Sequence, residues 1–138
     1  MRDVAIIGVG MIKFGRYPEK TVPELAAQAA LLALKDAGAE MKDIELMTSG
    51  NLYQSNAMVG QRILQIIGQT GIPVINVANA CATGSTAFRE AYMSVASGAY
   101  DVAMAIGSEQ MGKMGLLGGG GGGDPAYSTE GVVGSGLM

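Results

Sequence analysis

The stretch NACATGS, from Asn79 to Ser85, contains the single cysteine of the chain. A cysteine thiolate is a nucleophile that can carry an acyl group as a thioester. Cys81 follows an apolar, β-branched run and precedes a run with helical periodicity, which places it at a strand-to-helix turn. A lone cysteine is more often a small buried hydrophobe. The partial positive charge and free N–H groups of a helix N-terminus, however, favour an anion such as a thiolate, so the setting favours a nucleophile.

The neighbours of Cys81 suit acyl transfer. Ala80, Ala82, Gly84 and Ser85 are small, so an acyl group could approach closely. The N–H of Cys81 is among the unpaired donors at the helix start and could stabilise an oxyanion. The chain has no histidine, and a cysteine nucleophile needs a base or a strong cation for full activation. We therefore predict that Cys81 is one component of a site whose base lies elsewhere.

The surrounding sequence alternates between short apolar runs and longer helical patterns. A capping box starts the first helix at Thr21, and Gly38 ends it. This helix is apolar on nearly every side, which predicts that it is buried. The predicted strands span residues 4–9, 44–48, 73–77 and 102–106, and the predicted helices span residues 21–37, 58–67 and 82–97. The order β-α-β-α-β-α-β predicts an α/β fold, with helices on both faces of a layered sheet and right-handed crossovers.

Two glycine motifs could bind phosphate. Gly8 and Gly10 follow the first apolar run, but a dinucleotide fingerprint needs a third glycine and an immediate helix, and position 13 is a lysine. The hexaglycine block at residues 118–123 lacks the Lys-Ser/Thr ending of a P-loop. Neither motif predicts a phosphate site, and we expect the block to be a mobile loop.

Other candidate side chains have structural explanations. Glu109 follows the fourth predicted strand and could face a site, although bracing a loop is the favoured interpretation. Met111 and Met114 could line an apolar channel or belong to the core. With one cysteine, no histidine and no spaced carboxylates, the sequence predicts no metal site.

The composition restricts the class of protein. The 138 residues suggest one domain; 49% are apolar and only 15% are charged, below the usual ~25%, which suggests a surface partly covered by another chain or domain. A net charge of −3 without a basic cluster argues against nucleic-acid binding. Apolar runs are too short for a membrane span, and a lone cysteine suits a reducing compartment, so we predict a cytoplasmic protein. The ending GVVGSGLM stops inside an apolar pattern, which indicates a fragment.

Four segments, in order, resemble the thiolase superfamily, in particular its lipid-transfer or sterol-carrier-type acetyl-CoA acetyltransferases. NACATGSTAFREA resembles the nucleophile segment. RDVAIIGVGMIKFG resembles the opening strand and loop, AIGSEQMGKM the segment after the fourth strand, and STEGVVGSGLM the start of the loop domain. The resemblance covers the N-terminal part of the family's fold, with residues 1–110 as the α/β core and 111–138 as the start of the loop domain.

The resemblance implies a function. Cys81 would carry the acyl group, with its N–H in one oxyanion hole, during formation or thiolytic cleavage of a 3-ketoacyl-CoA. Coenzyme A thioesters would be substrates, with no covalently bound cofactor, and the residues that bind coenzyme A are unknown. The family's general base is a histidine from its second half, so this chain would be catalytically incomplete. A homodimer would form through residues 72–80, and a second polypeptide is a further partner.

Alternatives stay open at this point. An aldolase on the same scaffold cleaves a sterol side-chain acyl-CoA without a cysteine nucleophile, and Cys81 favours the thiolase over it. A non-catalytic partner subunit fits the missing base and the low charge. A ketoacyl-carrier-protein synthase shares the fold and the cysteine, but the Gly-Ser-Glu-Gln-Met segment favours a thiolase.

Overall fold

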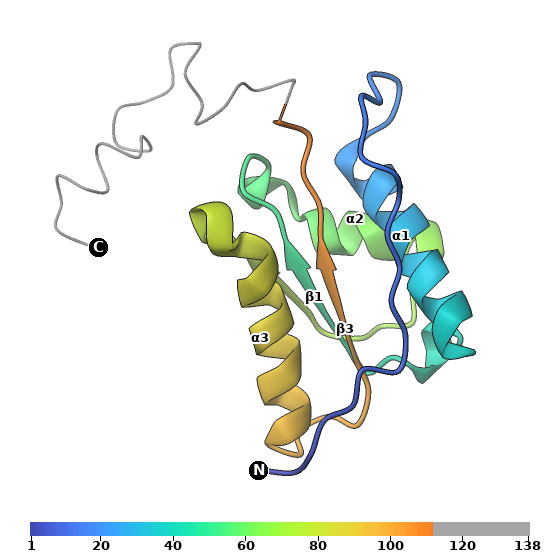
Figure 1. Cartoon of the computed structure of the whole chain (residues 1–138), viewed down its shortest axis with the longest axis vertical. Coiled ribbons are helices and arrows are strands. Elements are labelled where there is room, and N and C mark those ends of the chain that lie inside the picture. The colour runs from blue at the N-terminus through green and yellow to red at the C-terminus, as the bar shows by residue number, and fades with distance from the viewer. Residues whose placement is uncertain (112–138) are drawn as a thin grey trace, which may run out of the picture.

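A computed structural model describes residues 1–111 of the chain. Within them, helices alternate with strands, as Figure 1 shows. The helices are α1 (Val22–Ala37), α2 (Val59–Ile67) and α3 (Thr83–Ala96), and the strands are β1 (Leu46–Gly50), β2 (Val74–Val77) and β3 (Ala103–Gly107). Short 3₁₀ turns occupy Met41–Asp43 (η1), Ser55–Ala57 (η2) and Ala80–Ala82 (η3). Each of these helices and strands lies within two residues of its predicted position.

The strands form a three-stranded parallel sheet in the order β2-β1-β3. On β1, Thr48 lies opposite Ile75 of β2 and Ala105 of β3. Because all three strands run in the same direction, their carboxyl ends meet at one end of the sheet. The loops that follow Gly50, Val77 and Gly107 therefore start close together.

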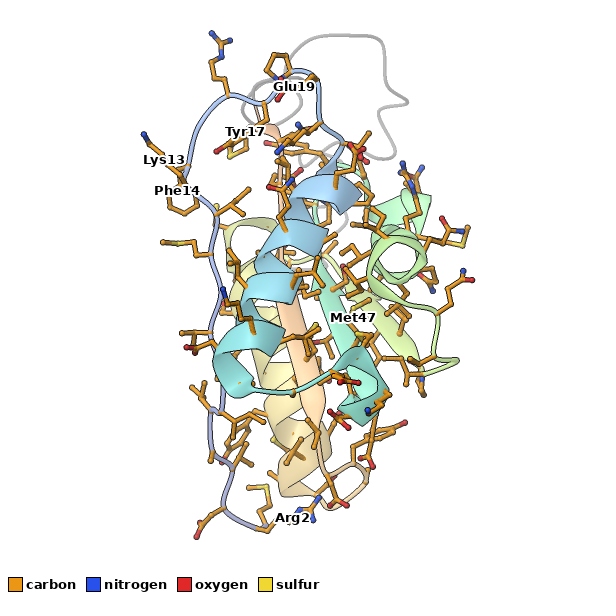
Figure 2. The ribbon with its side chains drawn as sticks, turned by 90° about the vertical axis from the view of Figure 1, so that its right-hand side faces the viewer. Arg2, Lys13, Phe14, Tyr17, Glu19 and Met47 are labelled. Carbon is orange, nitrogen blue, oxygen red and sulfur yellow. The ribbon has the colours of Figure 1, made fainter. Side chains whose placement is uncertain are left out.

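Helices cover both faces of the sheet, as predicted. On one face, α1 and α2 pack on alternate strand residues to form the main core, and Met47, labelled in Figure 2, is fully buried in it. On the other face, α3 crosses the sheet, and the Thr48 hydroxyl donates a hydrogen bond of 2.8 Å to the Ala87 carbonyl. The core cluster comprises Val22, Ala26, Ala27, Ala30, Leu34, Met41, Ile44, Met47, Val59, Ile63, Leu64, Met104 and Ile106.

Helix α1 begins and ends where its sequence predicts. The N–H and hydroxyl of Thr21 both donate to Glu24 Oε2, at 2.6 and 2.8 Å, and Gly38 ends the helix at φ 64°. Gly38 suits this left-handed position because it has no Cβ. The prediction that the helix is buried on every side is wrong, because Leu31 and Leu32 are 50% and 45% exposed. Only one face of α1 meets α2 and the sheet.

The predicted first strand, residues 4–9, is wrong: this segment has no strand structure. β1 pairs with β2 on one side and β3 on the other, and among the described residues the segment pairs with neither of these outer strands. The segment lies instead along the outside of α1 (Figure 2). Gly8 and Gly10 permit this close approach, since a Cβ would lie 2.5 Å from the Ala33 oxygen or 2.3 Å from the Ala29 oxygen.

The sequence predicts a loop domain that begins at residue 111. Residues 112–138, nearly all of that predicted domain, lie outside the described part of the chain. The hexaglycine block, Met114 and the segment expected to begin a loop domain all fall there. Within residues 1–111, no helix is long and apolar enough to cross a membrane.

Candidate active-site turn

Cys81 lies in the turn between β2 and α3, in the middle of η3, and its side chain is exposed. The turn follows the carboxyl end of β2, and Figure 1 shows the start of α3 at the end of the sheet where β1 and β3 finish. The structure therefore places the cysteine in the predicted strand–turn–helix setting. Its role as a nucleophile stays a prediction.

The backbone before Cys81 has an unusual conformation. Ala80 adopts φ 44°, in the left-handed region where a non-glycine residue costs about 1–2 kcal/mol. The turn is held by short-range bonds: the Asn79 carbonyl accepts from Ala82 N–H at 2.9 Å, and the Ala80 carbonyl accepts from Thr83 N–H. A strained residue beside an exposed cysteine is typical of positions that present a reactive side chain.

Side chains around the turn complete its hydrogen bonding. The Thr83 hydroxyl accepts from Asn79 N–H at 2.7 Å and donates to the Ala80 carbonyl at 2.8 Å. The Asn79 side-chain amide donates to the Thr86 hydroxyl at 3.0 Å. Sequence reasoning did not single out Asn79, Thr83 or Thr86. Their residue types, which commonly bond the backbone at helix starts, are the signal that could have found them.

The backbone N–H of Cys81 has no hydrogen-bond acceptor within residues 1–111. The next two amides along the chain are both bonded, to the Asn79 and Ala80 carbonyls. A free N–H beside an exposed sulfur can donate to the oxygen of an acyl group attached to that sulfur. The Cys81 N–H is thus available for the predicted role of oxyanion donor, and that role stays a prediction.

The ends of the neighbouring strands lie against the start of α3. A Cβ at Gly50 would lie 2.9 Å from the Thr83 carbonyl oxygen and 3.1 Å from Thr83 Cγ2. A Cβ at Gly107 would lie 3.4 Å from the Cα of Gly84. Glycine at the ends of β1 and β3 thus lets the Cys81 turn sit directly on the sheet.

Glu109, after β3, braces a loop, which confirms the favoured interpretation. Its carboxylate accepts from the N–H groups of Leu52 and Tyr53 at 2.9 and 3.1 Å. It also accepts from the Asn51 side chain at 3.2 Å and from Gln110 N–H at 3.1 Å. With its oxygens engaged by these donors, Glu109 fixes the loop after β1.

Among residues 1–111, the glycines considered for phosphate binding do not meet a helix start. Gly8 and Gly10 lie along the side of α1, whose N-terminus begins only at Val22, so no helix start faces them. Within residues 1–111, no group of three or more His, Cys, Asp or Glu side chains could hold a metal ion. Met111, at the end of the described residues, is 45% exposed.

Comparison with known proteins decides the family. The family model described as "Thiolase, N-terminal domain" matches residues 4–117, which is most of the chain. The chain belongs to the thiolase N-terminal domain family. The resemblance stated from the sequence is therefore confirmed, and the fold of the described residues is that of a partial thiolase-type domain.

Individual relatives agree. The chain is 43% identical to an acetyl-CoA acetyltransferase of Methanocaldococcus jannaschii, over 80% of this chain and 29% of that protein. It is 41% identical to sterol carrier protein 2 of Gallus gallus, over 86% of this chain and 22% of that protein. The chain thus spans about a quarter of the length of these curated relatives.

Solved structures share the fold. The 3-oxoacyl-[acyl-carrier-protein] synthase III of Aquifex aeolicus aligns with a TM-score of 0.59 at 19% identity, covering 78% of this chain and 35% of that one. The priming β-ketosynthase of the R1128 polyketide pathway aligns with a TM-score of 0.61 at 22% identity, covering 74% and 31%. At such identities the likeness concerns the fold alone.

Proposed function

We propose that this chain supplies the nucleophile of a thiolase-type acyl-CoA acyltransferase, which makes or thiolytically cleaves a 3-ketoacyl-CoA through an acyl group on Cys81. The observation that carries the proposal is the exposed Cys81 in a strained turn, beside its own N–H, for which residues 1–111 supply no acceptor. The names of the acetyl-CoA acetyltransferase relatives support this class of reaction.

The chemistry needs few groups from this chain. The Cys81 thiolate attacks the thioester carbonyl, and the negative charge that develops on the carbonyl oxygen is stabilised by the Cys81 N–H. The C–S bond to coenzyme A then breaks, coenzyme A leaves as its thiolate and takes up a proton, and the acyl group remains on Sγ. The small side chains of Ala80 and Ala82 leave room for that acyl group.

The proton that Cys81 loses needs an acceptor. The 138 residues contain no histidine, and the partial charge of a helix start alone activates a thiol weakly. We therefore propose that the base and the groups that bind coenzyme A belong to residues beyond these 138, in the same or a second polypeptide. The chain by itself would be acylated slowly and would not turn over.

Two measurements test the proposal. First, the purified chain is incubated with acetyl-CoA, and peptide mass spectrometry locates any acetyl group, with Cys81→Ala as the control for lysine acetylation. We expect a hydroxylamine-sensitive adduct on Cys81; its absence after long incubation would sink the nucleophile role. Second, acetoacetyl-CoA and coenzyme A are added and thiolysis is followed. Sustained turnover by the chain alone would contradict its catalytic incompleteness.

A non-catalytic partner subunit is the second candidate. Several large apolar side chains are strongly exposed, among them Ile6, Val9 and Phe14 at 68%, 68% and 85%. Such surface is typical of a face that meets another chain. The acetyl-CoA experiment separates the two candidates, because a purely structural subunit would leave Cys81 unmodified.

We also propose that the chain forms a homodimer through residues 72–80. β2 is an edge strand, and Ile75 on it is 38% exposed. An unpaired apolar edge is stabilised by pairing with a second strand. Sedimentation analysis should find a dimer that Ile75→Lys weakens, and a monomeric unmodified chain would contradict it. A cytoplasmic location, suited to a free cysteine, belongs to the same proposal.

A further inference from the structure

We propose that Thr83 is a positioning residue for the acyl-transfer site: its hydroxyl ties the two sides of the turn together and holds the Cys81 N–H where an oxyanion forms. The inference rests on the proposed function of Cys81 and names the side chain on which the geometry of the turn depends. Thr83 does not touch the acyl group; it acts through the backbone on either side of Cys81.

The first observation is the pair of hydrogen bonds that one hydroxyl makes. Thr83 Oγ1 accepts from Asn79 N–H at 2.7 Å and donates to the Ala80 carbonyl at 2.8 Å. One oxygen thus uses its single proton and a lone pair on two consecutive residues that precede Cys81. Thr83, the first residue of α3, thus bonds the peptide group that precedes Asn79 and the peptide group that joins Ala80 to Cys81.

The second observation is that Thr83 is itself fixed. It is 7% exposed, and its Cγ2 lies against Gly50 at the end of β1. A β-branched side chain packed in this way has little freedom at χ1. Packing against β1 therefore fixes the Thr83 side chain, and the hydroxyl of that side chain fixes the backbone of the turn.

The third observation concerns what the hydroxyl prevents. Without it, the Asn79 N–H would lose its partner and the Ala80 carbonyl would keep only the bond from Thr83 N–H, so Ala80 could leave its strained φ of 44°. Relaxation of Ala80 rotates the peptide that carries the Cys81 N–H, because that N–H belongs to the peptide bond between Ala80 and Cys81. The Cys81 sulfur would stay exposed while its oxyanion donor turned away.

Two small reagents distinguish the reactivity of the Cys81 sulfur from oxyanion stabilisation by the Cys81 N–H. p-Nitrophenyl acetate acetylates a thiolate through a tetrahedral oxyanion, releasing p-nitrophenolate as the new C–S bond forms. Iodoacetamide alkylates the same thiolate by displacing iodide, with no oxyanion. The ratio of the two rates at Cys81 therefore reports the donor rather than the exposure of the sulfur, and Cys81→Ala supplies the background for both.

The variants are chosen to divide hydrogen bonding from packing. Thr83→Val keeps the branched shape and removes the hydroxyl, whereas Thr83→Ser keeps the hydroxyl and removes Cγ2. Thr48→Val is the matched control, because Thr48 is a buried threonine whose hydroxyl bonds the same helix at Ala87, away from the turn. We expect Thr83→Val to lower the ratio about tenfold, less than the about 10²- to 10³-fold that an enzyme loses with an oxyanion donor, because the donor is turned and not removed. Thr83→Ser and Thr48→Val should leave the ratio within about twofold.

Each result has a definite meaning. An unchanged ratio in Thr83→Val, or a ratio lowered equally in Thr48→Val, would overturn the positioning role. Should Thr83→Val fail to fold, amide hydrogen exchange in the unmodified chain decides: slow exchange at Asn79 beside fast exchange at Cys81 supports the tie, and fast exchange at both overturns it. Neither reagent contains coenzyme A, so failure of acetyl-CoA to acylate the chain would count against the proposed function and leave this inference standing.

Discussion

The turn around Cys81 and the N-terminal segment of residues 1–20 are both irregular backbone, yet they are held in different ways. In the turn, hydrogen bonds join Asn79, Ala80, Ala82 and Thr83 to one another, and Thr83 is buried against the end of β1. The N-terminal segment lies outside α1 with most of its large apolar side chains exposed. The first region is fixed by local polar groups, and the second rests on a neighbouring helix.

The N-terminal segment is attached chiefly through the backbone and side chain of Arg2, through Val9, and through two bonds that Gln110 donates near its far end. Arg2 donates from its backbone N–H to the Ala96 carbonyl at 3.0 Å and forms an exposed ion pair with Asp101 at 2.7 Å. Val9 N–H donates to Asp36 Oδ2 at 2.9 Å. Exposed ion pairs contribute little to stability. The contrast indicates that an irregular segment becomes rigid when side chains satisfy its backbone and the sheet buries those side chains.

The largest expected effect comes from adding one methyl group beneath the Cys81 turn. Gly50→Ala places a Cβ 2.9 Å from the Thr83 carbonyl, so the start of α3 must move away from the sheet. We expect a loss of about 2 kcal/mol in the free energy of unfolding, measured in urea, because overpacking a buried contact costs that much. Acetylation of Cys81 by p-nitrophenyl acetate should also slow.

Gly84→Ala is the matched control for this change. Gly84 follows Thr83 in the first turn of α3, and a Cβ on Gly84 would meet no atom within 4 Å. We expect a gain of about 0.5–1 kcal/mol from the lower entropy of the unfolded chain. If Gly84→Ala lowered the stability as much as Gly50→Ala, the helix start would be sensitive to any added methyl group. The effect of Gly50→Ala could then not be assigned to the contact between Gly50 and Thr83.

The second expected effect tests the loop that follows β1. Glu109→Gln leaves one oxygen where two accept from Leu52, Tyr53, Asn51 and Gln110. We expect a loss of about 1–2 kcal/mol in the free energy of unfolding, since hydrogen bonds to a charged acceptor contribute about 1.5–3 kcal/mol and glutamine keeps one accepting oxygen. Glu90→Gln, at a half-buried position of α3 where the carboxylate pairs with the exposed Arg89, should change it by less than about 0.5 kcal/mol. If Glu109→Gln and Glu90→Gln changed the free energy of unfolding equally, the hydrogen bonds of Glu109 would not stabilise the loop after β1.

The same contrast explains what the sequence could predict. The runs at residues 73–77 and 4–9 are both largely apolar, and the sequence predicts a strand for each. Only the first is one: it pairs with β1, whereas residues 4–9 lie along α1 and pair with neither of the outer strands, β2 and β3, among the described residues. Hydrophobicity reports that a segment prefers burial, but it does not report which neighbour is available.

In the candidate site, too, the sequence predicts some features and not others. Cys81 could be located from sequence because strand, turn and helix signals are local, and small residues around it are visible in the sequence. The bonds from Thr83 to Asn79 and Ala80 could not, since they depend on the left-handed φ of Ala80 and on the packing of Thr83 against Gly50. Those depend on a strand more than thirty residues away in the sequence, whose approach no local pattern encodes.

The third prediction concerns a glycine-to-alanine substitution in the N-terminal segment. Gly10→Ala creates a closer clash than Gly50→Ala, with the new Cβ 2.3 Å from the Ala29 carbonyl oxygen. Even so, we expect a loss of less than about 1 kcal/mol, because the segment buries few large side chains and can move away from α1 as a unit. Trypsin cleavage after Lys13 and Arg16 should become faster. A loss as large as that of Gly50→Ala would show that the segment is as firmly held as the turn.

The smallest expected effect is also the sharpest test of the N-terminal segment. Ile6 is 68% exposed and Ile63 on α2 is 0% exposed, so the same substitution can be made in both. Ile6→Thr should change the free energy of unfolding by less than about 0.5 kcal/mol, whereas Ile63→Thr should cost at least about 2 kcal/mol through lost burial and an unpaired hydroxyl. Because Ile6 belongs to an apolar surface suited to a partner, Ile6→Thr should reduce self-association in light scattering. If Ile6→Thr instead destabilised the chain as much as Ile63→Thr, residues 4–9 would be buried in solution, and the four-stranded order predicted from the sequence would describe this segment better than its position outside α1.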